Sequence, residues 1–143
     1  MKKAIRIGAI GAITALLAVM YVWFFVYNKP HQNFEMAKPE KVLSASQCFE
    51  NFSKNNTPDD GKVLEIYGIP SSIETADSMV VVCFYFKKGM FGDEGIRCTL
   101  LPKFQKAASK LSTTDTVYIK GFCAGYNGTD VIFEKSSIIN KDK

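Results

Sequence analysis

The sequence predicts a mainly β domain that follows a single membrane-spanning helix. An uncharged apolar run occupies residues 7–27, several later segments are rich in β-branched and aromatic residues, and an Asn127-Gly128 pair separates the last two of them. With 143 residues, 47% of them hydrophobic and 22% charged, the chain has room for one ordinary globular core besides the helix.

The apolar run predicts a membrane anchor over residues 1–27, because a bilayer crossing needs about 20 apolar residues. The run ends in the bulky segment YVWFFVY rather than in a small-residue cleavage site, which favours an uncleaved anchor; a cleaved signal peptide is the alternative. Lys2, Lys3 and Arg6 precede the run and only Lys29 follows it closely. Since cytoplasmic flanks are rich in Lys and Arg, we expect a single-pass protein of the inner (cytoplasmic) membrane with its C-terminal domain in the periplasm or outside.

Residues 28–43 hold two prolines and mixed charges with little periodicity, which predicts a stalk, and the domain is expected over residues 44–143. Ser44 and Gln47 have the spacing of a capping box and begin a short amphipathic helix. Cys48, Phe49 and Phe52 lie on the apolar stripe of this helix and should be buried.

Five strands are predicted after this helix, at residues 62–69, 79–86, 96–101, 115–123 and 129–139. A second helix is predicted over residues 102–111, because Pro102 suits a first helical turn and the apolar period changes there. The order of three strands, a helix and two strands is that of the OB-fold, a five-stranded Greek-key barrel in which this helix plugs one end.

Several blocks carry a narrower resemblance. The segments KPEKVLSASQCFENF, GIRCTL, DTVYIKGFCAG and DVIFEKSSI resemble, in this order, the tRNA_anti-like family of OB-fold proteins, which are small and often membrane-anchored in Bacteroidota. The resemblance covers nearly the whole chain after the anchor. It implies a relationship to anticodon-binding barrels and assigns no ligand.

The four cysteines stand at positions 48, 83, 98 and 123, too far apart for the closely spaced ligand pairs of structural zinc sites, so no metal is expected. Cys98 and Cys123 alternate in step with the apolar residues of their strands, which places both inside the barrel. Two interpretations stay open for this pair: a disulfide formed in an oxidising compartment, or free thiols packed in the core.

Catalysis is not expected, and neither is a cofactor. The one histidine, His31, lies in the predicted stalk, where it cannot serve as a positioned base for a serine or cysteine nucleophile. The acidic pairs Asp59-Asp60 and Asp93-Glu94 fall in polar loops, where carboxylates are usually solvated.

Barrels of this type bind ligands on the outer face of their second and third strands. If Val80, Val82, Phe84 and Phe86 point inward, then Val81, Cys83 and Tyr85 point outward. The predicted ligand-binding residues are Tyr85, Arg97 and Thr99, with Tyr126 and Asn127 at the rim of the same face. The alternative is an ordinary half-exposed sheet.

Charge bears on the class of ligand. Three of the 18 Lys and Arg residues precede the end of the span, whereas none of the 14 Asp and Glu residues does, so the exported part is close to neutral. A nucleic-acid-binding domain usually shows a basic face. We therefore expect a membrane-tethered binding module without catalytic activity, whose ligand is an envelope glycan, a peptide or an envelope protein. The alternatives are a nucleic-acid-binding barrel and a structural component of an envelope complex.

Overall fold

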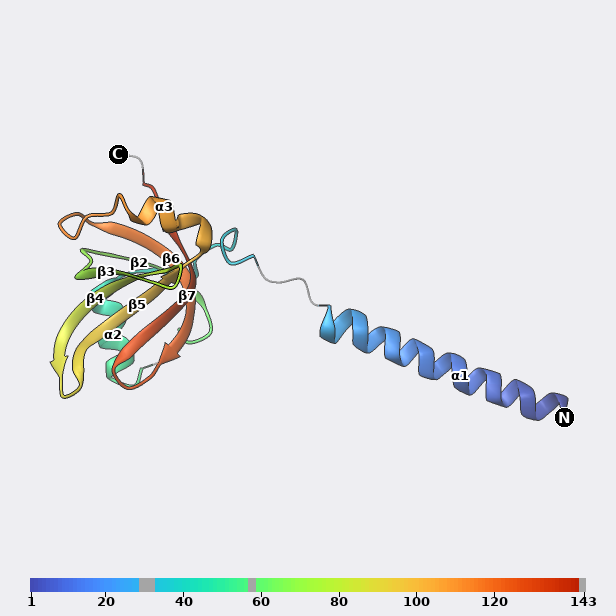
Figure 1. Ribbon diagram of the computed structural model, residues 1–143. Helices are drawn as coiled ribbons and strands as arrows, with labels where there is room; N and C mark the ends of the chain where they lie inside the picture. Colours follow the sequence, from blue (N-terminus) through green and yellow to red (C-terminus); the bar gives the residue numbers. More distant parts are fainter. Residues whose placement is uncertain (29–32, 57–58, 142–143) are drawn as a thin grey trace. The chain divides into compact units, whose positions relative to one another are not determined.

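The computed structural model describes residues 1–28, 33–56 and 59–141 (Figure 1). The chain divides into two compact units, Met1–Gln32 and Asn33–Lys143. The first unit is helical, with α1 at Lys2–Val22 followed by a π-helical turn, η1, at Trp23–Tyr27. Within the described residues, Ile5–Tyr27 is the one stretch of helix long and apolar enough to cross a membrane, with a mean hydropathy of 2.3. It could act as a single-pass anchor or as a signal sequence. His31 lies outside the described residues.

The second unit is mainly β. Its elements are β1 (Lys41–Ser44), α2 (Ala45–Ser53), β2 (Val63–Gly68), β3 (Ser72–Ala76), β4 (Met79–Gly89), β5 (Gly92–Leu100), η2 (Pro102–Phe104), α3 (Gln105–Ala108), β6 (Val117–Tyr126) and β7 (Asp130–Ile139). All five predicted strands are found, as β2, β4, β5, β6 and β7. The sheet nevertheless has seven strands. The two additional strands are β1, which was predicted as part of the stalk, and β3, which was predicted as part of a polar connection.

The strands lie in the order β1-β2-β6-β7-β5-β4-β3. The pairs β1–β2 and β5–β7 are parallel and the other four are antiparallel. Although β2 and β3 stand near opposite ends of this order, only residues 69–71 separate them along the chain. The sheet must therefore curl until its ends approach each other, and Gly68 of β2 indeed packs against the ring of Phe84 of β4.

The two helical segments lie at different ends of the curled sheet (Figure 1). Ser44 caps α2 as predicted, with its Oγ accepting a hydrogen bond from the backbone N–H of Gln47 at 3.2 Å. The helix buries Cys48, Phe49 and Phe52 and contacts β1, β2, β4, β5 and β7. The helix predicted over residues 102–111 is much shorter, one 3₁₀ turn followed by the four residues of α3. Of the two helices, α2 is the longer, and it contacts five strands of the curled sheet.

The core contains the inward-facing residues of five strands together with the apolar stripe of α2. Its fully buried members include Phe52, Leu64, Ile66, Val82, Phe84, Ile96, Cys98, Ile119, Cys123, Val131 and Phe133. Cys98 and Cys123 thus face the interior, as the alternation predicted. The register sets them against Phe133 from opposite sides of β7, two strand spacings apart. Their Cα atoms are then about 9–10 Å apart, beyond the roughly 7 Å that a disulfide spans, and all four cysteines are free and buried.

The predicted stalk is shorter than expected, because residues 33–44 lie against the domain. The ring of Phe34 packs on that of Phe122 with centroids 5.0 Å apart, and the ammonium of Lys135 lies 4.8 Å from the centre of the Phe34 ring. Lys120 donates hydrogen bonds to the carbonyls of Glu35 and Ala37, the latter at 2.9 Å. The sequence did not predict this packing, because Phe34 is the one aromatic residue in a segment of prolines and mixed charges.

Candidate functional site

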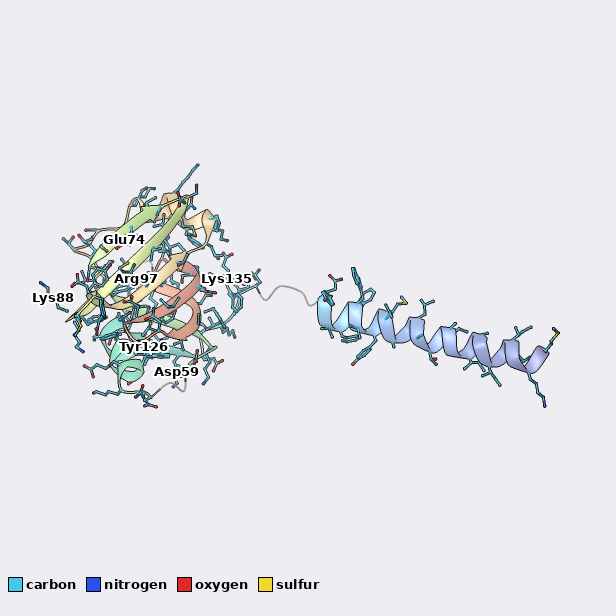
Figure 2. All side chains as sticks on the ribbon, turned by 60° about the horizontal axis from the view of Figure 1, so that its bottom comes forward. Asp59, Glu74, Lys88, Arg97, Tyr126 and Lys135 are labelled. Carbon is cyan, nitrogen blue, oxygen red and sulfur yellow. The ribbon has the colours of Figure 1, made fainter. Side chains whose placement is uncertain are left out.

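Charged and aromatic side chains surround Arg97 on the outer face of β3, β4, β5 and β7. Figure 2 labels Arg97 and Glu74 on this face. The Nε of Arg97 donates to Asp130 Oδ2 at 3.2 Å, and its Nη1 lies 3.5 Å from Glu74 Oε2. Its guanidinium carbon is 5.9 Å from the centre of the Tyr85 ring. We call Glu74, Tyr85, Arg97 and Asp130 the arginine cluster. Each residue comes from a different strand, and the four strands are neighbours in the sheet, so strand pairing assembles the cluster.

Tyr85 and Glu74 are joined directly. The hydroxyl of Tyr85 donates to Glu74 Oε1 at 2.9 Å, and the backbone N–H of Tyr85 donates to Ser71 Oγ at 2.9 Å. Burial, together with hydrogen bonding to Cys83 and Glu74, raises the pKa of the phenol to about 12. Tyr85 therefore stays protonated at neutral pH and acts as a fixed donor that orients the carboxylate of Glu74.

Asp130 is held from three sides. Its Oδ1 accepts the buried N–H of Gly95 at 3.0 Å, and its own N–H donates to Asn127 Oδ1 at 2.7 Å. Gly95 has no room for a side chain, because an added Cβ would lie 1.8 Å from the carbonyl oxygen of Phe84. The close approach of the two strands at Gly95 thus leaves its N–H directed at Asp130.

Cys83 lies beneath this cluster. By alternation it points outward, as predicted, yet it is fully buried and does not belong to the interior core. It pairs with Ser72 of β3 on one side and with Arg97 of β5 on the other. Burial raises the pKa of its thiol. The thiol therefore stays neutral beneath the polar groups and does not act as a nucleophile at neutral pH.

The other predicted residues take different positions. Thr99 is half-buried on β5, two residues from Arg97 and opposite Val81. Tyr126 packs its ring against the core and donates its hydroxyl to the carbonyl of Gly128 at 2.8 Å. Asn127 is exposed, but its Oδ1 accepts three hydrogen bonds from Thr129 and Asp130. The structure therefore brings Tyr85 and Arg97 together, whereas Tyr126 and Asn127 stabilise the turn that presents Asp130.

Phe86 keeps the predicted inward direction but is not buried. Its ring stacks on that of the core residue Phe49 of α2, with centroids 5.6 Å apart, and it lines the same hollow as Phe84. The residue is nevertheless 43% exposed. The register between β4 and β5 shifts next to it, between Tyr85 and Lys87. Beyond this shift the hairpin ends in Met90 and Phe91, which are 91% and 93% exposed.

Glu74 and Asp130 were missed by sequence reasoning. Glu74 belongs to a short strand whose polar composition reads as a connection, and Asp130 follows the Asn127-Gly128 turn, where a polar residue attracts no attention. The signal for Glu74 was weak, because Ile73 and Thr75 are β-branched but residues 72–76 do not alternate strictly between polar and apolar side chains. The signal for Asp130 was its spacing from Asn127, because the side-chain oxygen of an Asn in a turn can accept from backbone N–H groups that follow it.

A hollow of about 150 Å³ lies beside the cluster, with Phe91, Glu94, Arg97, Thr129 and Asp130 among its walls. Typical small-molecule pockets measure about 300–1,000 Å³. A ligand would therefore lie across the face and place only one group in the hollow. Arg97 still has N–H donors besides those directed at Asp130 and Glu74, and its side chain is 38% exposed, so it can contact such a ligand.

Neither a metal site nor an activated thiol is found in the part of the chain that the structure describes. No group of three His, Cys, Asp or Glu residues is placed there to hold a metal ion. Burial raises the pKa of Cys48 to about 12 and that of Cys123 to about 11. The absence of enzymatic activity stays a prediction.

These features define a class: a small mainly β domain with a curled seven-stranded sheet, preceded in the chain by one long apolar helix. The tRNA_anti-like family matches residues 1–138, essentially the whole chain. The chain belongs to the tRNA_anti-like family.

No curated protein sequence matches the chain. Among solved structures, OBody AM3L15 bound to hen egg-white lysozyme is similar at 21% identity and a TM-score of 0.40, covering 64% of this chain and 89% of that one. OBody AM1L10 bound to the same lysozyme is 19% identical with a TM-score of 0.40, covering 63% and 92%.

Proposed function

We propose that the chain is a membrane-tethered, exported OB-fold binding module without catalytic activity, and that the arginine cluster binds its ligand. The observation that carries this proposal is the position of Arg97 between the carboxylates of Glu74 and Asp130 on an accessible sheet face. The apolar helix over Ile5–Tyr27 acts as an uncleaved anchor of the cytoplasmic membrane, with the domain on its outer side.

The topology supports the OB-fold assignment. When β2 and β3 are counted as one strand bent at residues 69–71, strands β2/β3, β4, β5, β6 and β7 form five strands in OB order, and β1 is an addition at the edge of β2. The parallel pair β5–β7 corresponds to the parallel pairing of the third and fifth strands in this arrangement. The arginine cluster then lies on the face that such barrels use for ligands.

Within the glycan, peptide and protein ligands that remain possible, the cluster fits a glycan best. Fixed carboxylates accept hydrogen bonds from hydroxyl groups, the remaining guanidinium donors of Arg97 supply the opposite polarity, and Tyr85 offers a ring beside them. The hydrogen bonds within the cluster hold these groups in place before the ligand arrives. Little ordering entropy is therefore lost on binding.

Nucleic acid is the second candidate, because the family description names a tRNA-related domain. Phosphate binding needs unbalanced cationic charge. The charge of Arg97 is balanced by Glu74 and Asp130, and Lys87 lies 3.6 Å from Glu94. These pairs weigh against a nucleic acid on this face.

A direct test applies the detergent-solubilised full chain to a glycan array and to labelled single-stranded oligonucleotides at about 150 mM salt. We expect glycan binding that Glu74→Gln and Arg97→Gln both reduce at least about tenfold, with Asp115→Asn, an exposed acid elsewhere, as the control. Micromolar oligonucleotide binding that is lost in Arg97→Gln would establish the second candidate in place of the first.

A further inference from the structure

A second cluster lies on the outer face of β2 and β6, separate from the arginine cluster. Glu65 of β2 is a carboxylate whose side chain is only 8% exposed. Its Oε1 is buried, and among the described residues no hydrogen bond of good geometry satisfies it. Of the charged groups in the described ranges, the ammonium of Lys141 is the one in contact, with Nζ 2.7 Å from that oxygen. A buried carboxylate normally requires a cation or donors close by.

The neighbouring lysine does not serve this role. Lys120 stands directly opposite Glu65 in the β2–β6 pairing. Its ammonium instead donates to the carbonyls of Glu35 and Ala37 in the segment that packs over β6. Glu65 is thus left to a cation that comes from outside the two strands.

Two aromatic rings complete the surroundings of this cation. Tyr67 and Tyr118 face each other across the same strand pair with ring centroids 5.7 Å apart. The Nζ of Lys141 lies 4.4 Å from the centre of the Tyr118 ring. The contact with Glu65, and then the nearby Tyr118 and Tyr67, raise the pKa of the Lys141 ammonium. A carboxylate combined with aromatic faces is the environment that proteins use to bind ammonium groups.

We propose that Glu65, Tyr67 and Tyr118 form a binding site for a primary alkylammonium group, such as the lysine side chain of a partner, and that Lys141 occupies this site in cis. Lys141 lies just beyond β7, outside the sheet, and its side chain is 49% exposed. Displacing it therefore requires no rearrangement of the sheet. A groove of about 960 Å³ has Tyr118, Ile139 and Lys141 among its walls and so adjoins the Tyr118 side of the site.

Because Lys141 occupies the site, an external ammonium ligand must compete with it. A tethered group acts at an effective concentration on the order of millimolar. An external ammonium must compete with Lys141 in the natural chain, whereas it meets an open site when the lysine side chain is removed. Lys141→Ala should therefore strengthen binding, and Glu65→Gln should abolish it.

The probe is N-acetyl-lysine N-methylamide, and its neutral control is N-acetyl-norleucine N-methylamide, which has the same stem without the ammonium. Binding is followed in the full chain, in a maltoside detergent, from the ring signals of ¹³C-labelled tyrosine and from the unfolding temperature. We expect the lysine probe to bind Lys141→Ala at least about tenfold more tightly than the natural chain. It should also raise the unfolding temperature of that variant, since a ligand that binds the folded state stabilises it.

Two variants separate this site from general effects. Lys110→Ala removes another lysine on the rim of the same groove and should leave binding unchanged. The double variant Lys141→Ala/Glu65→Gln removes the carboxylate and should lose the response to the lysine probe while retaining its fold. Equal binding of the two probes to Lys141→Ala, or binding of the lysine probe to the double variant as tight as to Lys141→Ala, would overturn the proposal.

Discussion

Asp130 links the arginine cluster to the stability of the sheet, and substitutions there test the geometry described above. Asp130→Ala removes the acceptor of the buried Gly95 N–H and one of the two carboxylates beside Arg97. Asp130→Asn keeps an amide oxygen that can accept from Gly95, but its NH2 group then faces the Nε–H of Arg97, so both the charge and the hydrogen bond to Arg97 are lost. The two variants therefore divide the contribution of Asp130 into a part due to Gly95 and a part due to Arg97.

The expected magnitudes follow from burial. A buried N–H left without an acceptor costs about 1–3 kcal/mol. The ion pair contributes less, on the order of 0–1 kcal/mol, because the Arg97 side chain is 38% exposed and retains Glu74. Asp130→Ala should therefore lower the free energy of unfolding by about 1–4 kcal/mol, whereas Asp130→Asn should lower it by about 1 kcal/mol or less.

Urea unfolding of residues 33–143, the compact second unit, followed by far-UV circular dichroism, measures both values. Asp115→Ala changes an exposed acid and should stay within about 0.5 kcal/mol of the natural chain. Equal losses in Asp130→Ala and Asp130→Asn would show that charge, and not the Gly95 hydrogen bond, dominates. A loss below about 0.5 kcal/mol in Asp130→Ala would refute the buried geometry at Gly95.

Further predictions concern the thiols, the topology and the packed segment. Cys123→Ala should lower the free energy of unfolding by about 1–2 kcal/mol, because it deletes a buried core atom. Because Cys123 is a free thiol, every remaining cysteine of the variant should still titrate as a free thiol after unfolding. Because the folded thiols of Cys48 and Cys123 keep their protons up to pH 11–12 while unfolded thiols lose theirs near pH 9, urea midpoints should fall as the pH rises above about 9. A cysteine at Met90, which is 91% exposed, should react with a membrane-impermeant maleimide in intact cells, while the natural chain does not react; reaction only after lysis would reverse the orientation. Phe34→Ala should make residues 33–40 more susceptible to proteolysis, since it removes the ring that packs on Phe122.

Local patterns predicted what depends on local chemistry. The capping of α2 by Ser44, the burial of Cys48, and the inward position of Cys98 and Cys123 all follow from helix and strand periodicity. The five strands that were predicted are those rich in β-branched and aromatic residues, which favour strands. The apolar helix was equally plain, because a span without charge has few other interpretations.

What escaped prediction depends on contacts between distant segments. β1 and β3 are short and gain their strand conformation from pairing with β2 and β4. The 43% exposure of Phe86 depends on how far α2 reaches along β4, which the sequence of β4 alone does not indicate. The distance between Cys98 and Cys123 depends on β7 lying between β5 and β6, so alternation could place both thiols inside without deciding whether they meet.

The charge arrangement of the two outer-face clusters gives each a different selectivity. In the arginine cluster the cation is surrounded by two carboxylates that also bind the backbone and Tyr85, so the positive charge of Arg97 is offset and hydrogen-bond geometry decides whether a neutral ligand binds. At Glu65 a buried carboxylate faces a cation from beyond β7, so charge decides what binds. Added salt should therefore weaken an ammonium ligand at Glu65 more than a glycan at Arg97, because screening acts on net charge and leaves neutral hydrogen bonds nearly unchanged. The salt dependence of each ligand thus identifies which of the two clusters it occupies, independently of the substitutions.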